Sequence, residues 1–318
     1  MAWTVADIPN QQGRIALVTG ANSGLGLETT RALHAKGATV LMACRSRSKG
    51  ETALQLLQQT SGAGRLELLE LDLADLCSVQ RCIETVTSRY GRLDLLINNA
   101  GVMAPPRQVS RQGLELQLAT NHLAPMALTT ALLPLMEGQP SARVVTVTSG
   151  AQYFGRINWD DPCSEQRYDR WQAYSQSKLA NVMFALTLEE RLRAQASTTR
   201  SLAAHPGLAR TNLQPASIAA NGSRIEAFAY RLMDPLFQSA AMGALPQLHA
   251  ATAASAQGGE HYGPDGFGGL RGWPQRQPVA PAARDPSQRE RLWRLSEALL
   301  QGATTPDTPH QSADLAAD

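Results

Sequence analysis

The segment VTGANSGLG, Val18–Gly26, joins an apolar strand to a helix through three glycines. The residues RIALVTG are typical of a buried strand, and Leu25–Lys36 have a helical pattern. Gly20 permits the tight turn, Gly24 lets a ligand approach the backbone, and Gly26 lets the helix pack closely on the strand. The free N–H groups that begin such a helix favour an anion, most plainly a pyrophosphate. We therefore expect a binding turn made by Gly20, Asn22, Ser23, Gly24, Leu25 and Gly26.

Outward from this turn, short apolar runs alternate with longer helical patterns. Strands are expected at RIALVTG, ATVLMAC, LELLELD, LDLLINNAG, ARVVTVTSG and RSLAAHPG, and GGEHYG is a candidate for a short seventh. These runs are almost continuously apolar, as in a parallel sheet that is covered on both faces. The alternation predicts an α/β protein with a doubly wound Rossmann fold, in which a mainly parallel six- or seven-stranded sheet forms a single domain.

The pattern also suggests boundaries within the chain. We expect an N-terminal extension over residues 1–13, a nucleotide-binding domain over 14–302 and a disordered tail over 303–318. Residues 207–239 break the alternation and are expected to form an insert beside the site. The Pro- and Arg-rich segment Arg271–Arg284 is expected to be a surface loop, and Arg289–Leu300 has an amphipathic helical pattern.

Composition excludes several classes of protein. With 43% hydrophobic and 18% charged residues, the 318-residue chain can bury a sizeable core. A net charge of +2 gives no electrostatic reason to expect a nucleic-acid partner. The four cysteines show no CxxC pairing and the histidines no ligand spacing, so no metal site is expected. No run approaches the ~18 apolar residues of a membrane span, and we expect a cytoplasmic protein.

The end of the second strand bears on which nucleotide is bound. Chains that hold the ribose of NAD place an acid there, about 20 residues after the glycine turn. Here the segment MACRSRSK has Arg45 in that place. An arginine suits a 2′-phosphate through paired, charge-assisted hydrogen bonds, which favours NADP over NAD. The alternative is an exposed cationic loop.

Two further strand ends carry candidate cofactor contacts. Asp72 closes the third strand, with Leu73 beside it, and could accept a hydrogen bond from an adenine amino group; its alternative role is the N-cap of the next helix. The fourth strand ends in NNAG, at the carboxyl edge where open sheets bind ligands. Asn99 is expected to anchor the backbone there, and Ala100 and Gly101 to leave room for the cofactor. A structural turn is the alternative.

In the segment WQAYSQSKLAN, Tyr174 lies four residues before Lys178, one of only three lysines in the chain. Positions i and i+4 share a helix face, so both side chains point the same way. A free phenol titrates near pH ~10, and an adjacent ammonium lowers its pKa towards the range in which a general acid or base works. The compact ammonium also suits a ribose hydroxyl. The alternative is a Tyr–Lys pair on a solvated helix.

Two other polar residues fit the same chemistry. Ser149 ends the fifth strand, where its hydroxyl could hold a substrate oxygen, although such a serine is often a cap. Asn121, in LATNHLAP, interrupts a helical pattern and could bind a water that relays protons to Lys178. Its alternative role is a satisfied polar group between helices.

These segments resemble the short-chain dehydrogenase/reductase family over about Gly13–Tyr262. The resemblance rests on TGANSGLG, NNAG, Asn121, Ser149, YSQSK and HPG, while CRSRSKGE, NHLAP and YSQSKLANVMF resemble its retinol dehydrogenase and protochlorophyllide reductase-like branch. It implies a Rossmann fold, a nicotinamide cofactor and a catalytic tetrad of Asn121, Ser149, Tyr174 and Lys178. It further implies that Pro206, Gly207 and Thr211 lie near the nicotinamide. Members often pair through the helices that carry Asn121 and Tyr174, which suggests a homodimer.

We therefore expect an NADP-dependent alcohol dehydrogenase or carbonyl reductase that acts on a small or medium apolar substrate. Hydride transfer would be assisted by Tyr174 as acid or base. The pocket is expected to draw on Tyr153, Phe154, Trp159 and Trp171, although half of such aromatics belong to cores. Two other functions stay open: a sensor that binds the dinucleotide without turnover, and a reductase of carbon–carbon double bonds.

Overall fold

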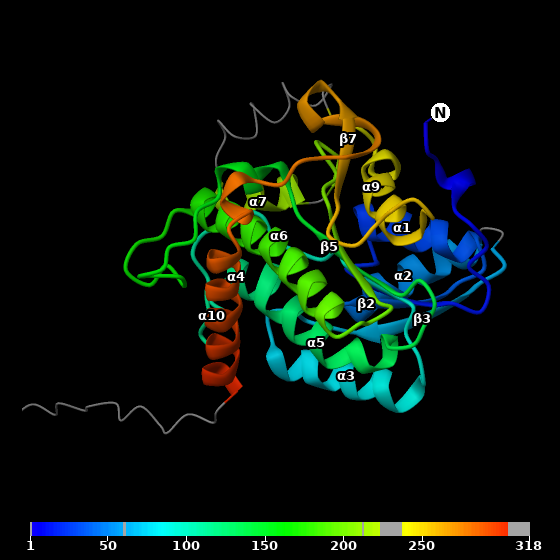
Figure 1. The fold of residues 1–318 in the computed structure, drawn as a ribbon, viewed down its shortest axis with the longest axis horizontal. Coiled ribbons are helices and arrows are strands. Elements are labelled where there is room, and N and C mark those ends of the chain that lie inside the picture. The colour runs from blue at the N-terminus through cyan, green and yellow to red at the C-terminus, as the bar shows by residue number, and fades with distance from the viewer. Residues whose placement is uncertain (1, 60–61, 212, 223–236, 305–318) are drawn as a thin grey trace, which may run out of the picture.

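The strands form one eight-stranded sheet, shown in Figure 1. They are β1 (Ile15–Thr19), β2 (Thr39–Cys44), β3 (Arg65–Glu70), β4 (Leu95–Asn98), β5 (Arg143–Val147), β6 (Arg200–Ala204), β7 (His261–Gly266) and β8 (Arg271–Arg276). Their order is β3-β2-β1-β4-β5-β6-β7-β8. This computed structural model describes residues 2–59, 62–211, 213–222 and 237–304.

The order of the strands locates a binding crevice. β1 pairs in parallel with both β2 and β4, so the direction of winding reverses between β1 and β4. In open α/β sheets a ligand binds at such a switch point, outside the carboxyl ends of the strands. The glycine turn after β1 and the NNAG segment after β4 both lie at this edge.

Helices cover both faces of the sheet (Figure 1). They are α1 (Gly24–Ala35), α2 (Arg47–Gln58), α3 (Leu76–Arg89), α4 (Leu116–Leu118), α5 (Ala124–Met136), α6 (Arg170–Ala194), α7 (Leu213–Asn221), α9 (Ala240–Thr252) and α10 (Pro286–Thr304). The short elements are η1 (Val5–Asp7), the π-helical turn η2 (Ala119–Leu123), η3 (Gly150–Phe154), η5 (Phe267–Gly269) and η6 (Pro281–Ala283). The prediction of a doubly wound, mainly parallel single-domain fold is confirmed.

Two apolar layers hold the helices to the sheet. Val18 and Met42 face α1, α2 and α9, whereas the neighbouring Leu17 and Leu41 face α3, α5 and α6. Successive residues of a strand point to opposite faces, and both faces are buried here, which explains why the strand sequences are apolar without alternation.

The prediction of a surface loop over Arg271–Arg284 is wrong for its first part. Arg271–Arg276 form β8, which pairs antiparallel with β7 and adds an eighth strand. Proline lacks the N–H of a central strand, but Pro274 lies on the edge strand, where that group is not needed. The Pro-rich composition was therefore compatible with a strand.

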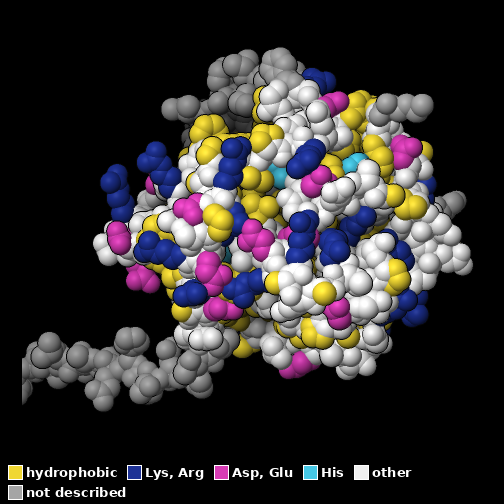
Figure 2. Space-filling view, viewed as in Figure 1, with side chains coloured by type: hydrophobic (Ala, Val, Ile, Leu, Met, Phe, Trp, Pro, Cys, Tyr) yellow, Lys and Arg dark blue, Asp and Glu magenta, His cyan; other side chains and the backbone are white. Residues whose placement is uncertain are grey.

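The remaining boundaries are partly tested. α10 runs from Pro286 to Thr304 and includes the first two residues of the predicted tail, the rest of which lies outside the described residues. Of the predicted insert, 212 and 223–236 also lie outside them. None of the described helices is both long and apolar enough to cross a bilayer. On the face seen in Figure 2, cationic and anionic side chains are interspersed.

Candidate active site

The glycine turn has the backbone that its sequence predicts. Gly20 and Gly24 have φ of +67° and +53°, in the left-handed region that side chains disfavour. A Cβ at Gly26 would lie 2.2 Å from the Gly20 carbonyl oxygen and 2.6 Å from Nδ2 of Asn99. The third glycine therefore lets α1 approach the end of β1. Ser23 is the N-cap of α1 but makes no side-chain capping bond, so the helix start keeps N–H groups for a ligand.

Cys44, which the sequence reading missed, supports this turn from the end of β2. Its sulfur accepts hydrogen bonds from the backbone N–H groups of Ala21 and Asn22, while burial raises the pKa of the thiol to about 11. Leu25 and Leu73 are buried, so either could contact a cofactor only through its backbone. A buried cysteine gives no sequence signal of such a role.

Thr19 ties the glycine turn to the end of β4. Its hydroxyl accepts hydrogen bonds from the N–H groups of Asn99 (3.0 Å) and Ala100 (2.9 Å), and Asn99 Nδ2 donates to the Thr19 carbonyl at 2.8 Å. Gln247 of α9 donates to Asn99 Oδ1 at 3.2 Å. Asn99 therefore anchors backbone at the crevice, as predicted, and Thr19 and Gln247 are partners that the sequence did not reveal.

The ends of β2 and β3 present one cation and one carboxylate. Arg45 is exposed and forms no hydrogen bond or ion pair within the described part of the chain. Asp72 accepts from the N–H of Ala74 at 3.0 Å. The alternative that Asp72 caps the next helix is wrong, because Asp75 is the N-cap of α3 and accepts from Cys77 N at 3.0 Å.

Asn121 lies in η2 and its amide is fully engaged by protein groups. Oδ1 accepts from the N–H of Val102 at 2.7 Å, and Nδ2 donates to the Val102 carbonyl and to the Ser177 hydroxyl, both at 2.9 Å. A Cβ at Gly101 would lie 2.9 Å from this oxygen and 3.4 Å from Lys178 Nζ. Gly101 therefore leaves room for Asn121 and Lys178, and its place beside the cofactor stays a prediction.

Ser149, Tyr174 and Lys178 meet at the carboxyl end of β5. Ser149 hydrogen-bonds the phenol of Tyr174 and also caps η3, which confirms its predicted capping role. Lys178 Nζ lies 5.8 Å from the centre of the Tyr174 ring and donates to the Val147 carbonyl at 3.3 Å. The i, i+4 spacing on α6 therefore places the ammonium beside the phenol, as predicted.

Burial governs the charge state of this pair. It raises the pKa of Tyr174, and the Ser149 hydrogen bond only partly opposes it. It lowers the pKa of Lys178 from 10.5 to about 8. The predicted lowering of the Tyr174 pKa by Lys178 is therefore absent from the protein alone, where desolvation is the largest influence on the phenol.

Pro206, Gly207 and Thr211 follow β6 towards the same crevice. Gly207 has φ +63°, and a Cβ there would lie 2.3 Å from the Leu270 carbonyl oxygen. The backbone conformation and the close contact therefore both require glycine at this position. The Pro206 carbonyl accepts from Gln238 Nε2 at 2.7 Å, which joins the two ends of the insert. A Cβ at Gly24 would lie 3.6 Å from Thr211 Cβ, so Thr211 lies over the glycine turn.

The four aromatic residues predicted for the pocket divide into two groups. Trp171 packs edge-on to Tyr174 with 6.4 Å between ring centres, and Phe154 is 82% exposed. Trp159 instead packs in the core beneath the Arg291 guanidinium. Tyr153 donates to the Pro278 carbonyl at 2.6 Å. Of these four aromatic residues, Trp171 therefore contacts a catalytic candidate, Tyr174.

The residues present fit a nicotinamide dinucleotide. The Lys178 ammonium is 4% exposed yet has one acceptor for its three protons, so a ribose hydroxyl would satisfy it further. The start of α1 suits the pyrophosphate and Arg45 suits a 2′-phosphate. No cluster of His, Cys, Asp and Glu among the described residues could hold a metal ion.

Comparisons with known proteins agree with this geometry. A family model described as short chain dehydrogenase matches residues 14–221. The human protein "Retinol dehydrogenase 12" is 38% identical over 290 residues, which cover 91% of this chain and 86% of that protein. A short-chain dehydrogenase/reductase of Armillaria gallica is 37% identical over 305 residues, with 93% of each chain covered.

One solved structure is similar over almost the whole chain. A crystal structure of an uncharacterised protein from Mycobacterium paratuberculosis has 41% sequence identity and a TM-score of 0.78. The match covers 95% of this chain and 98% of that one. The similarity therefore includes the C-terminal elements that lie beyond the family model's match.

Proposed function

The chain belongs to the short-chain dehydrogenase family, in its retinol dehydrogenase-like branch, and is an oxidoreductase; from this premise we propose that it interconverts a carbonyl and an alcohol with NADP(H). The observation that carries the proposal is the group formed by Ser149, Tyr174 and Lys178 at the carboxyl edge of the sheet. The proposed substrate is a small or medium apolar aldehyde, ketone or alcohol.

The residues divide the work as follows. When bound, the nicotinamide cofactor would supply the hydride that reduces the carbonyl carbon. The Ser149 hydroxyl holds the carbonyl oxygen, and Tyr174 donates its phenolic proton to that oxygen as negative charge develops. Lys178 holds the ribose and stabilises the resulting phenolate. The side-chain amide of Asn121 holds η2 in place through hydrogen bonds to Val102 and Ser177. The backbone of Asn121 is then the group that would position a relay water.

The charge states favour reduction at neutral pH. Because burial raises the pKa of Tyr174, the phenol is protonated at pH 7 and ready to act as an acid. Oxidation of an alcohol needs the phenolate, and we expect it to be faster at alkaline pH. The preference for NADP over NAD rests on Arg45, which is exposed at the end of β2 where an acid would bind the NAD ribose.

The decisive experiment is NADPH oxidation with a panel of apolar aldehydes and ketones, including retinaldehyde. We expect turnover that falls at least about 100-fold in Tyr174→Phe, while the Kd for NADPH is kept. Tyr90→Phe is the matched control. Tyr90 lies at the C-terminal end of α3, away from the site, where its hydroxyl donates a hydrogen bond to Glu67.

The same measurements separate the two other functions. Tight NADPH binding without turnover on any carbonyl or alcohol would identify a sensor. Turnover that saturates a carbon–carbon double bond and leaves the carbonyl intact, as found by product analysis, would identify a double-bond reductase.

A further inference from the structure

The helix α10, near the C-terminus, packs along α6, the helix that carries Tyr174 and Lys178 (Figure 1). Trp293 of α10 stacks on Phe184 of α6, with ring centres 5.7 Å apart and planes inclined by 17°. The Arg191 guanidinium lies 4.2 Å from the centre of the Trp293 ring and pairs with Glu290 at 2.9 Å. Apolar and ionic contacts thus fix α10 on this surface.

This contact leaves little of α6 exposed. Between Ala173 and Glu189, only Ser175 and Leu186 are even partly exposed. A helix that is buried all round ordinarily lies in the middle of a protein, whereas α6 lies on one face of a sheet. The surface of α6 that the predicted homodimer would use is therefore covered within one chain.

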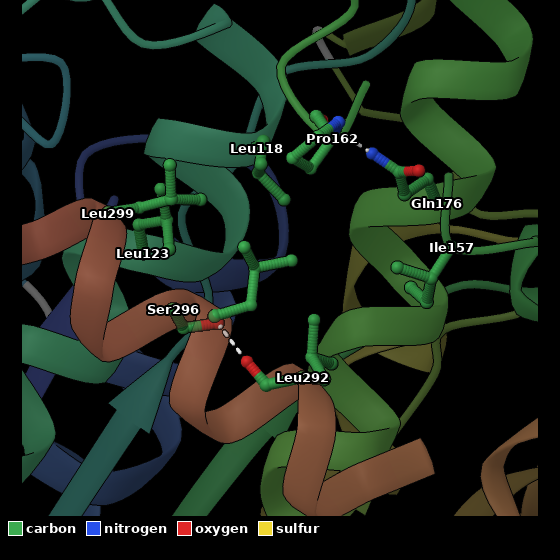
Figure 3. Close-up of a pocket in the computed structure, with 9 residues that line it drawn as sticks. Leu118, Leu123, Ile157, Pro162, Gln176, Leu292, Ser296 and Leu299 are labelled. Carbon is green, nitrogen blue, oxygen red and sulfur yellow. Dashed lines mark hydrogen bonds between the residues drawn. The ribbon is translucent and has the colours of Figure 1, made fainter. Parts of the chain in front are cut away.

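The junction between α10 and the site is closely packed. Leu118 and Leu123 at η2, together with Leu292, Ser296 and Leu299 of α10, line a small cavity, with Ile157 also at its wall (Figure 3). The cavity measures about 10 Å³, at the lower limit for one water molecule. Leu118 is the N-cap of η2 and Leu123 is its last residue, so α10 contacts the turn that carries Asn121.

One hydrogen bond crosses this junction. Ser296 donates its proton to the Leu292 carbonyl at 2.8 Å, and its oxygen lies within hydrogen-bond distance, 2.8 Å, of Nε2 of His122. His122 is 2% exposed, and burial lowers its pKa to about 4, although a hydrogen bond with Asn181 partly opposes this, so the ring is neutral at pH 7. The ring also packs edge-on against Phe184 at 6.1 Å. His122 directly follows Asn121 in the chain.

We propose that α10 is an internal brace that takes the place of a partner subunit: Ser296 holds His122, and His122 holds η2 in the geometry that presents Asn121. Ser296 and His122 are positioning residues that act through Asn121. Only the kinetic consequence of the brace rests on the proposed function.

The test compares three α10 variants of the full chain. Ser296→Ala removes the hydrogen-bond partner of His122 Nε2, Ser296→Thr restores a hydroxyl, and Leu299→Ala loosens the packing of the same junction without removing that bond. In Ser296→Ala we expect faster amide hydrogen exchange over residues 119–123, and a kcat about fivefold lower with an unchanged KM for NADPH. Ser296→Thr should restore both values.

Two results would overturn the brace. One is unchanged exchange over residues 119–123 in Ser296→Ala. The other is an equal fall in kcat in Leu299→Ala at a matched loss of stability, because packing alone would then account for the effect. Hydrogen exchange can be measured without a substrate. A wild-type protein that shows no turnover would therefore refute the proposed function, while the exchange data would still test the brace.

Discussion

Replacing Lys178 by methionine should stabilise the protein while abolishing its activity. The ammonium is 4% exposed, and burial lowers its pKa from the ordinary 10.5 to about 8. At about 1.4 kcal/mol per pKa unit, this difference corresponds to about 3 kcal/mol by which burying the charged form disfavours folding at pH 7. Methionine has a similar shape and no charge, and the Val147 carbonyl keeps its hydrogen bond from Asn181 at 3.1 Å.

The pH dependence separates this explanation from simple repacking. Between pH 8 and 10.5 the unfolded chain binds more protons at Lys178 than the folded protein, so the wild-type protein gains stability as pH rises through this window. The advantage of Lys178→Met should therefore be largest at pH 7 and vanish near pH 10.5.

Urea unfolding of both proteins without cofactor, at pH 7 and at pH 10, measures the difference. We expect Lys178→Met to be more stable by up to about 3 kcal/mol at pH 7, with NADPH turnover lost. A variant that is less stable than the wild type at pH 7, or a difference that does not change with pH, would show that the lysine is not held charged against its desolvation.

Three further predictions concern other parts of the site. Arg45→Asp should lower kcat/KM for NADPH at least about tenfold relative to NADH, and an unchanged ratio would remove Arg45 from the 2′-phosphate. Gly26→Ala places a Cβ 2.2 Å from a turn carbonyl and should abolish NADPH binding in a titration, whereas Gly91→Ala meets no atom within 4 Å and should bind normally. Burial lowers the pKa values of His205 and His261 to about 3 and about 4, so the stability that depends on their being neutral should be fully present above pH 6.5 and be lost as pH falls from 6.5 to 4; constant urea midpoints between pH 6.5 and 4 would contradict it.

Features that follow from local rules could be predicted from the sequence. The steric demand at Gly26 and the shared face of Tyr174 and Lys178 depend on residues within one turn or helix, and both are confirmed. The conformation of Gly20 follows from the same local argument. These rules need no knowledge of the distant chain, which is why they succeed.

Features that depend on distant residues could not be predicted. Pro274 argued against a strand until the sheet order placed it on an edge. Asp72 was a plausible cap until the true start of α3 fell at Asp75. The His122–Ser296 bond joins residues 174 positions apart, and neither residue type signals the other.

The environment of Asn121 combines both kinds of cause. Pro125 has no N–H, so the Asn121 carbonyl four residues earlier loses its α-helical partner. The helix accommodates this with the π-helical turn η2, in which the N–H of Ala124 bonds to the Ala119 carbonyl five residues back. A turn with weaker internal bonding needs support from outside, and Val102, Ser177 and α10 provide it. The proline in NHLAP therefore explains from the sequence why the helix is irregular. Only the fold shows which residues keep the irregular turn in place.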